Sequence, residues 1–422
     1  MVERRTPISI AEAVEKVMKH KLTGHVELIP IEESQDRFLA QDIVATNDVP
    51  HFNRSPYDGF ALRSKDTSEG SINTPLEFEV VEELAAGMVS TIPVQKNQVA
   101  RIMTGAQMPA ECDAVIMLEL TKEFEKDGKK YISFKRSLKE GENVSFQGED
   151  AKKGDVLVKK GTAINPGIIG LLATFGYAEV PVARKPVVGL FATGSELLDV
   201  HEPLQPGKIR NSNSHAISAQ IRRAGGEVRF YGKLKDEFEL SYEAISTALE
   251  EVDLLITTGG VSVGDFDLLP DIYQKIGADV LFNKVAMRPG SVTTVAVYND
   301  KFLFGLSGNP SASYVGFELF ARPIIRTMLF SEYPHLRKET AQLAEDFLKP
   351  NPFSRLLRTR LFYESGQLKV IPSGVDKSNI TTSLAGANSL TVLPGGTTRG
   401  FQTGDFVDIL LLDDQEGSKW PW

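Results

Sequence analysis

The spacing of apolar residues divides the chain into regions of different character. From Pro186 onwards, apolar runs of strand length alternate with segments in which apolar residues recur at helical spacing. This alternation is typical of a doubly wound α/β domain with a mostly parallel sheet. The strand-like runs are VVGLFAT, EVRFYGKL, LLITTGG, VLFNKVAM, TTVAVY and FLFGLSG, and SASYVGFELFARPIIRTML is predicted to close the domain as one long helix.

Strand signals dominate on both sides of this region. Between His25 and about Val182, short apolar runs are separated by Gly, Pro and charged turns, which indicates β-rich structure. After Pro334 the strand pattern returns, and it predicts a small, barrel-like C-terminal β domain. Near the N-terminus, apolar residues from Ile8 to Met18 follow helical spacing and predict an amphipathic helix that packs elsewhere in the chain.

Composition narrows the class of protein. The 422 residues are too many for one ordinary core, and the 41% hydrophobic and 24% charged fractions are typical of soluble globular proteins. The net charge of −9 argues against a nucleic-acid binder but permits a small anionic ligand. The single cysteine, Cys112, excludes an internal disulfide and a multi-cysteine zinc site. We expect a cytoplasmic protein, because neither a signal peptide nor a membrane-spanning apolar run is evident.

A glycine-rich turn follows the strand-like run LLIT and precedes a helix-like segment. Such a turn at a helix N-terminus forms an anion site, because its N–H groups and the helix dipole point at the ligand. Carboxylates in the same turn suggest a bridging cation such as Mg²⁺. An acidic helix cap with no ligand explains this stretch equally well. The residues concerned are Gly259, Gly260, Ser262, Gly264, Asp265 and Asp267.

Charged and polar residues also follow the other predicted strands. In an open α/β sheet, ligands bind beyond the carboxyl ends of the strands, so these residues are expected at one edge. Such an edge suits a phosphorylated ligand, with carboxylates that hold a metal. Each residue taken alone is more simply a solvated loop residue. The set contains the carboxylates Glu196, Asp236 and Asp265, the cations Lys284 and Arg288, and the turn Ser307, Gly308, Asn309 and Pro310.

Common nucleotide and hydrolase motifs are missing. The sequence has no P-loop, and no G-x-G-x-x-G opens the α/β region. TGSEL does not match G-x-S-x-G, so Ser195 is a poor esterase nucleophile. In the β-rich region, the turn residues Asp58 and Thr104 are interpreted at this level as plain turn formers.

Six blocks together carry a resemblance that covers essentially the whole chain. They are SPYDGFAL, RIMTGA, TGSEL, TTGGVSVGDFD, NKVAMRPG and LSGNPSAS. In this order they resemble the molybdopterin molybdenumtransferase family, which is homologous to the C-terminal part of gephyrin. The resemblance implies insertion of molybdate into adenylylated molybdopterin, with Mg²⁺, to give molybdenum cofactor and AMP.

The resemblance assigns roles to individual positions. It implies that Asp58 and Thr104 are active-site residues, and that Lys284 and Arg288 contact the anionic substrate. Ser291 is a departure, since the family often has a third Lys there, and this weakens the case for a third cation. The implied catalytic and metal-binding carboxylates are Glu196, Asp236 and Asp265. The implied substrate-binding positions also include Gly259, Gly260, Ser262, Gly264, Ser307, Gly308, Asn309, Pro310 and, by a looser match, Arg360 and Ser378.

The resemblance also implies a domain order and partners. A homodimer is expected, with the active cleft shared between one subunit's α/β domain and the other's β domains, and an adenylyltransferase partner is possible. The predicted domains are residues 1–24, a helix packing on the α/β domain; 25–48 with 146–182, a β-rich linker domain; 49–145, the β-rich domain II; 183–332, the molybdopterin-binding α/β domain; and 333–422, the C-terminal β domain.

Two other functions compete with this interpretation. A molybdopterin adenylyltransferase typically has T-G-G-T-G after the equivalent strand, whereas this chain has TGGVSVG from Thr258, and the flanking β domains also disfavour it. A gephyrin-like scaffold without catalysis has no need of the acidic residues. The chain keeps Asp58, Glu196, Asp236 and Asp265, which favours an enzyme.

Overall fold

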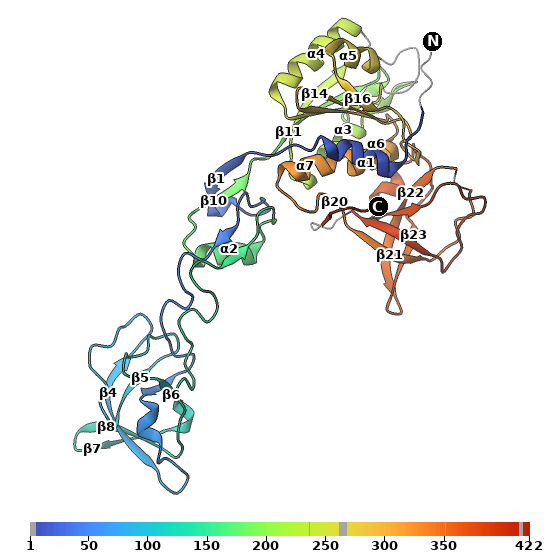
Figure 1. Cartoon of the computed structure of the whole chain (residues 1–422). Helices are drawn as coiled ribbons and strands as arrows, with labels where there is room; N and C mark the ends of the chain where they lie inside the picture. The colour runs from blue at the N-terminus through green and yellow to red at the C-terminus, as the bar shows by residue number, and fades with distance from the viewer. Residues whose placement is uncertain (1–5, 236, 261–267, 351, 413–416) are drawn as a thin grey trace. The chain divides into compact units, whose positions relative to one another are not determined.

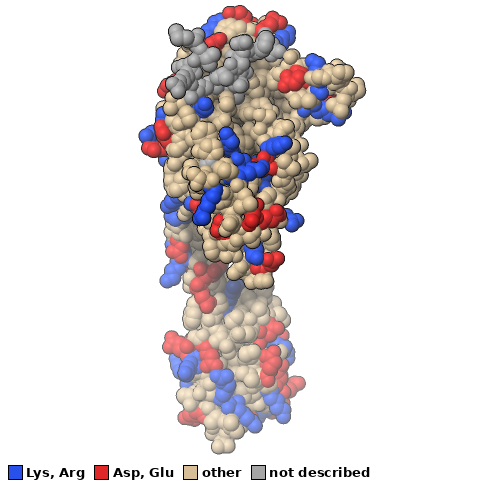
Figure 2. Space-filling view, turned by 90° about the vertical axis from the view of Figure 1, so that its right-hand side faces the viewer, with Lys and Arg blue, Asp and Glu red and all other residues tan. Residues whose placement is uncertain are grey.

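The chain forms two compact units. The computed structural model describes residues 6–235, 237–260, 268–350, 352–412 and 417–422. The larger unit comprises Met1–Gln41, Lys159–Gly170 and Ala178–Trp422, and the smaller comprises Asp42–Val158 and Leu171–Tyr177 (Figure 1). Charged side chains of both signs lie on the face drawn in Figure 2. Among the described residues, no helix combines the length and apolar character needed to cross a membrane.

A six-stranded mixed sheet forms the centre of the larger unit. Its first four strands are parallel, whereas the last two run antiparallel to their neighbours. This confirms the predicted α/β fold with a mostly parallel sheet. The strand order is β14 (Glu227–Leu234), β11 (Val187–Thr193), β15 (Leu254–Thr258), β19 (Lys301–Leu306), β18 (Thr294–Tyr298) and β16 (Asp279–Phe282).

Helices cover both faces of this sheet. Leu254 and Ile256 of β15 pack into one apolar cluster, whereas Leu255 belongs to the cluster on the opposite face. This alternation follows from the two-residue period of a strand, and burial on both faces explains why β15 is apolar throughout. Helix α3 (Asn213–Ala224) contributes to the first cluster, and α4 (Phe238–Glu251) and α5 (Leu269–Ile276) contribute to the second.

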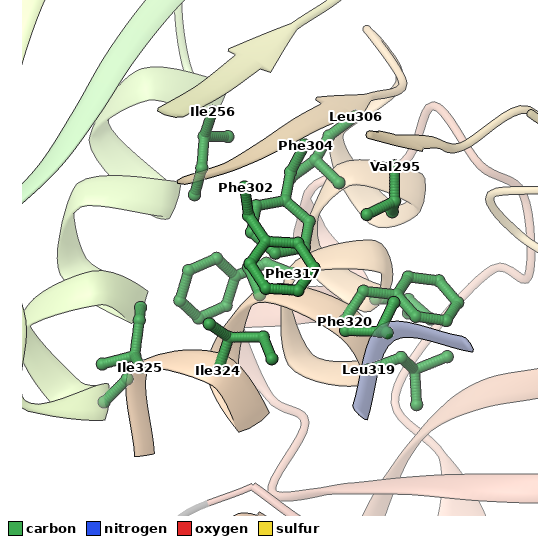
Figure 3. Packing of buried hydrophobic residues seen from close by; sticks show 14 of the residues in the cluster. Ile256, Val295, Phe302, Phe304, Leu306, Phe317, Leu319, Phe320, Ile324 and Ile325 are labelled. Carbon is green, nitrogen blue, oxygen red and sulfur yellow. The ribbon is translucent and has the colours of Figure 1, made fainter. Parts of the chain in front are cut away.

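The predicted long helix is present, but it contains a π-helical turn. Helix α6 (Pro310–Gly316) continues through η4 (Phe317–Ala321) into α7 (Arg322–Met328). Pro323 has no N–H to donate to the carbonyl four residues before it, and a wider turn accommodates this gap. The element still buries its apolar face: in Figure 3, Phe317, Phe320 and Ile324 pack below the sheet residues, which are Ile256, Phe302, Phe304 and Leu306.

The N-terminal helix α1 (Ile10–Lys19) packs against the same cluster. The Ser9 side chain caps it by accepting a hydrogen bond from the Glu12 N–H at 3.1 Å. Ala13, Val14 and Val17 are buried, as the predicted apolar stripe requires. Ahead of the helix, the Ile8 N–H donates to the Lys284 carbonyl at 3.2 Å.

The C-terminal part forms a closed five-stranded barrel, as predicted. Closure arises because β24 pairs with both β25 and β22. The short strand β17 (Met287–Arg288) adds to β22 in parallel, so the predicted strand VLFNKVAM is divided between two sheets. The barrel strands are β22 (Ser354–Glu364), β23 (Gln367–Pro372), β21 (Lys338–Leu343), β25 (Phe406–Leu411) and β24 (Ser389–Leu393).

The smaller unit contains a six-stranded sheet of its own. Phe60 and Leu62 of β3 pack into one apolar cluster and Ala61 into another, so both faces of the sheet are covered. The strand order is β6 (Ala114–Met117), β3 (Gly59–Leu62), β5 (Gln98–Ile102), β4 (Leu76–Leu84), β8 (Lys129–Phe134) and β7 (Lys122–Lys126), and β2 (Ile43–Val44) pairs with β9 (Val156–Val158).

Short elements complete the described chain. The paired strands are β1 (Val26–Pro30) with β10 (Glu179–Ala183), β12 (Leu197–Leu198) with β13 (Ile209–Arg210), and β20 (His335–Leu336) with β26 (Gly417–Ser418). The remaining helices are α2 (Pro166–Thr174), α8 (Thr382–Ala385), and the single turns η1 (Ile31–Glu33), η2 (Ser64–Thr67) and η3 (Leu118–Leu120).

Candidate functional site

A pocket of about 880 Å³ lies at the carboxyl ends of the parallel strands. Residues that follow β11, β14, β15 and β19 all contribute to its wall, as expected for an open α/β sheet. The pocket therefore brings together several residues that the sequence identified. Its polar lining is Thr193, Ser195, Glu196, Lys235, Ser241, Ser307 and Asn309, together with Gly194, Gly259, Gly260 and Gly308.

The turn after β15 requires glycine. Gly259 has a φ of 93°, and a Cβ atom at this position would lie 2.4 Å from the Thr193 hydroxyl oxygen. The Gly259 N–H donates to the Leu306 carbonyl at 2.8 Å, which fixes the turn against the neighbouring strand β19. Pro310 follows the turn after β19 as the first residue of α6.

Three carboxylates were predicted to bind a metal, and of these Glu196 is the one that lies among the described residues. It lies on the loop after β11 and is exposed, and its carboxylate folds back over Gly194, where an added Cβ would meet Oε2 at 2.4 Å. Asp236 and Asp265, like Ser262 and Gly264, lie outside the described residues. Among the described residues, no group of three or more His, Cys, Asp or Glu residues is arranged to hold a metal ion.

A smaller pocket of about 280 Å³ adjoins the first one. The two pockets share Val292, Ser307 and Asn309, so their walls are continuous. The charged and hydroxyl residues that line the smaller pocket are Arg288, Ser291, Ser307, Arg355, Asp376, Lys377 and Ser378.

Two arginines of β22 hold the barrel loop that lines this smaller pocket. The Asp376 carboxylate accepts a hydrogen bond from Arg358 Nη1 at 2.9 Å and also pairs with Arg355. Arg358 is almost fully buried, and burial lowers the pKa of its guanidinium although Asp376 opposes the shift. On the other side, the Ser311 N–H of α6 donates to the Ser378 carbonyl at 3.0 Å.

Three described residues of the predicted substrate-binding set, Lys284, Pro310 and Arg360, line neither pocket. Lys284 is half-buried, and its carbonyl accepts the hydrogen bond from Ile8. Arg360 is exposed on β22 with its guanidinium carbon 6.0 Å from the centre of the Phe362 ring. In the part of the chain that the structure describes, Arg355 and Lys377 are the barrel cations at the pocket. No sequence motif marks Arg355 or Lys377, because only the pairing of β17 with β22 brings the barrel beside Arg288.

Asp58 and Thr104 lie together on the smaller unit. Asp58 precedes β3 and Thr104 follows β5, and the antiparallel register of these strands places the two residues at the same end. The Thr104 N–H and hydroxyl both donate to Asp58 Oδ1, at 2.7 and 2.9 Å. These bonds, the backbone one first, lower the pKa of the exposed Asp58 carboxyl, so it is held ionised.

Three protein-family models match successive parts of the chain. Residues 8–176 match the MoeA N-terminal region (domain I and II), and residues 189–327 match a probable molybdopterin binding domain. Residues 340–412 match the MoeA C-terminal region (domain IV). The central match contains every strand of the α/β sheet except the first two residues of β11.

Curated relatives and solved structures resemble the chain over nearly its whole length. Molybdopterin molybdenumtransferase of Bacillus subtilis is 56% identical over 100% of this chain and 98% of its own. The Staphylococcus aureus (strain COL) protein of that name is 48% identical over 99% of both chains. The crystal structure of the molybdopterin biosynthesis moeA protein from Pyrococcus horikoshii OT3 superimposes with a TM-score of 0.81 and 30% identity, covering 96% of this chain and 100% of that one. Together with the fold, these matches show that the chain belongs to the molybdopterin molybdenumtransferase family of transferase enzymes.

Proposed function

We propose that the chain inserts molybdenum from molybdate into adenylylated molybdopterin, with Mg²⁺, and releases AMP. The observation that carries the proposal is the continuity of a nucleotide-sized pocket with a small cationic one. The larger volume lies within the range of roughly 300–1,000 Å³ that small-molecule sites occupy. Relatives that carry the transferase name at 56% and 48% identity support the same activity.

The larger pocket is proposed to hold the adenylylated pterin. In the turns after β15 and β19, the N–H groups of Gly260 and Gly308 and the Ser307 hydroxyl suit the oxygens of a phosphoanhydride. The smaller pocket is proposed to hold molybdate, because Arg288 and the Ser378 hydroxyl line a space that suits a small oxyanion. A molybdate held there lies beside the pterin substrate, since the two pockets share a wall.

The carboxylate at the larger pocket fits a magnesium ion. Glu196 offers exposed oxygen ligands, which Mg²⁺ prefers, and no described residue donates a hydrogen bond to its side chain. Asp236 and Asp265 are proposed to complete the ligand set. When bound, Mg²⁺ supplies positive charge to the phosphoanhydride oxygens.

The remaining chemistry is proposed to be electrostatic rather than covalent. Arg288 and the glycine-turn N–H groups orient the anionic groups and offset the charge that develops as the anhydride is hydrolysed and AMP leaves. Asp58, held ionised by Thr104, is proposed to act in the same site. As the family resemblance implies, we also propose a homodimeric enzyme with a cleft shared between its subunits. Asp58 would come from the smaller unit of one subunit and the pockets from the larger unit of the other.

The decisive experiment is AMP release from adenylylated molybdopterin with Mg²⁺, measured with and without molybdate. Molybdate-dependent release is expected. If ATP is instead consumed when free molybdopterin is offered, the chain is an adenylyltransferase and the proposal is wrong. Binding of the pterin with neither reaction indicates a scaffold and also contradicts the proposal.

A further inference from the structure

We propose that Lys377 is a molybdate-binding residue of the smaller pocket and is held in position by the ion pairs of its neighbour Asp376. This inference rests on the proposed function, because it assumes that the smaller pocket receives the molybdate. Lys377 would add a cation from the barrel loop to Arg288, the cation from β17.

Hydrogen bonds to its backbone carbonyls fix the loop that carries Lys377. Arg358 Nη2 donates to the carbonyls of Lys377 at 3.2 Å and of Val375 at 3.4 Å, and the Ile380 N–H also donates to the Lys377 carbonyl at 3.3 Å. The Arg355, Arg358 and Asp376 side chains are only 12%, 1% and 6% exposed. Buried, mutually paired charges of this kind hold the backbone of residues 375–378 in one position.

The side chain of Lys377, in contrast, is available to a ligand. Lys377 is exposed at the pocket, and within the described chain no residue accepts a hydrogen bond from its ammonium or pairs with it. Asp376 is engaged by the two arginines, so the carboxylate nearest in sequence does not compete for the lysine. A fixed backbone with an unengaged ammonium is the arrangement expected of an anion-binding lysine.

The remaining lining suits a tetrahedral oxyanion. Ser291, Ser307 and Ser378 offer hydroxyl donors, and Arg288 faces the same pocket from β17. About 280 Å³ is enough for molybdate but small for a nucleotide. A lysine ammonium is a compact point charge, so it can bind such an anion in several orientations without the planar geometry that arginine imposes.

The test is titration of sodium molybdate into the full-length protein by calorimetry, with AMP as a second ligand. Lys377→Ala is expected to bind molybdate about tenfold more weakly, as for loss of one charged hydrogen bond, and AMP unchanged. Lys369→Ala is the matched control, because Lys369 lies on β23 of the same barrel and pairs with Glu364. It is expected to bind both ligands normally.

A rescue variant separates charge from shape. Ser291 lines the same pocket, so Ser291→Lys in the Lys377→Ala background is expected to recover molybdate binding. Steady-state kinetics of Lys377→Ala should show a raised KM for molybdate with an unchanged KM for the pterin substrate.

Two outcomes would overturn this inference, and a third would overturn the proposed function. If the wild-type protein binds molybdate and turns over while Lys377→Ala equals it, this inference is wrong and the proposed function stands. Weakened AMP binding with normal molybdate binding also overturns it, because the lysine then serves a phosphate of the nucleotide. If the wild-type protein neither binds molybdate nor shows molybdate-dependent AMP release, the proposed function itself fails.

Discussion

At the scale of single residues, hydrogen bonds from near neighbours affect the pKa of one predicted site residue. This residue is Asp58: it is exposed, yet two hydrogen bonds from Thr104 hold the pKa of its carboxyl below the usual range. Asp346 has the same arrangement, because its carboxylate accepts hydrogen bonds from the N–H and hydroxyl of Thr403, and these bonds likewise lower its pKa. The two hydrogen bonds are therefore compatible with both interpretations of Asp58, and its active-site role stays a prediction from the resemblance.

Replacing Thr104 by Val should raise the pKa of Asp58 toward its usual value. The substitution removes the hydroxyl donor but leaves the backbone N–H, which contributes most to lowering that pKa, so the shift should be partial. The measurement is an NMR titration of the Asp58 carboxyl. Thr121→Val, which removes a hydroxyl bonded to the Leu118 carbonyl, serves as the control. An unchanged Asp58 pKa in the Thr104→Val protein would contradict the assignment.

Replacing Glu196 by Ala should abolish most turnover and leave stability nearly unchanged. The side chain is exposed, so the free energy of unfolding should change by no more than about 0.5 kcal/mol. If the carboxylate holds a catalytic Mg²⁺, AMP release should fall by about 10²–10³-fold. Asp199→Ala tests a nearby exposed carboxylate that pairs with Lys233 and should retain activity. Full activity in Glu196→Ala would exclude this carboxylate from the reaction.

At the scale of elements, the pocket walls depend on contacts between segments remote in sequence. The barrel loop at residues 375–378 is held from one side by β22 and from the other by α6, through Ser311. The paired charges between β22 and this loop are largely buried. Removing one member of a buried pair lowers the free energy of unfolding much more than removing one member of a surface pair.

Replacing Asp376 by Ala should destabilise the protein by about 3–5 kcal/mol, because it leaves the buried Arg358 and the largely buried Arg355 without their carboxylate. Urea unfolding measures this change. Asp408→Ala removes an exposed pair with Lys338 on the same barrel, and its effect should stay within about 1 kcal/mol. Equal effects of the two substitutions would show that the Asp376 pairs do not hold the loop.

At the scale of the whole molecule, the predicted site residues are distributed over two compact units. Asp58 and Thr104 belong to the smaller unit, whereas Glu196 and both pockets belong to the larger. In the proposed homodimer, each active cleft would draw on the smaller unit of one subunit and the larger unit of the other.

Sedimentation equilibrium is expected to give a dimer mass, and inactive variants should complement each other. Coexpression of Asp58→Ala and Glu196→Ala chains should yield about one quarter of wild-type activity: random pairing makes half of the dimers mixed, and each mixed C₂ dimer has one intact site of two. A monomer mass, or mixtures as inactive as either variant alone, would exclude the shared cleft.

Local patterns in the sequence determined the fold class and much of the larger pocket. The strand LLIT, its glycines at 259 and 260, and the turn at residues 307–309 were identified because apolar runs and glycine turns are local signals. Once the strands are known to be parallel, their carboxyl ends must lie at one edge, so residues that follow them converge without knowledge of the packing. Arg288 was identified by its motif, which is also local.

Only the tertiary structure decided which cations surround the smaller pocket. Lys284 lies in the same motif as Arg288, yet its backbone pairs with Ile8 and its residue lines neither pocket. Arg355 and Lys377 carry no motif of their own. They reach the pocket because the chain leaves the α/β sheet after β16 and forms β17, which pairs with β22 of the barrel. Hydrogen bonds to β22 and α6 also fix the loop that follows β23. Pairing between remote strands depends on which apolar surfaces pack together, and a local pattern does not encode that choice.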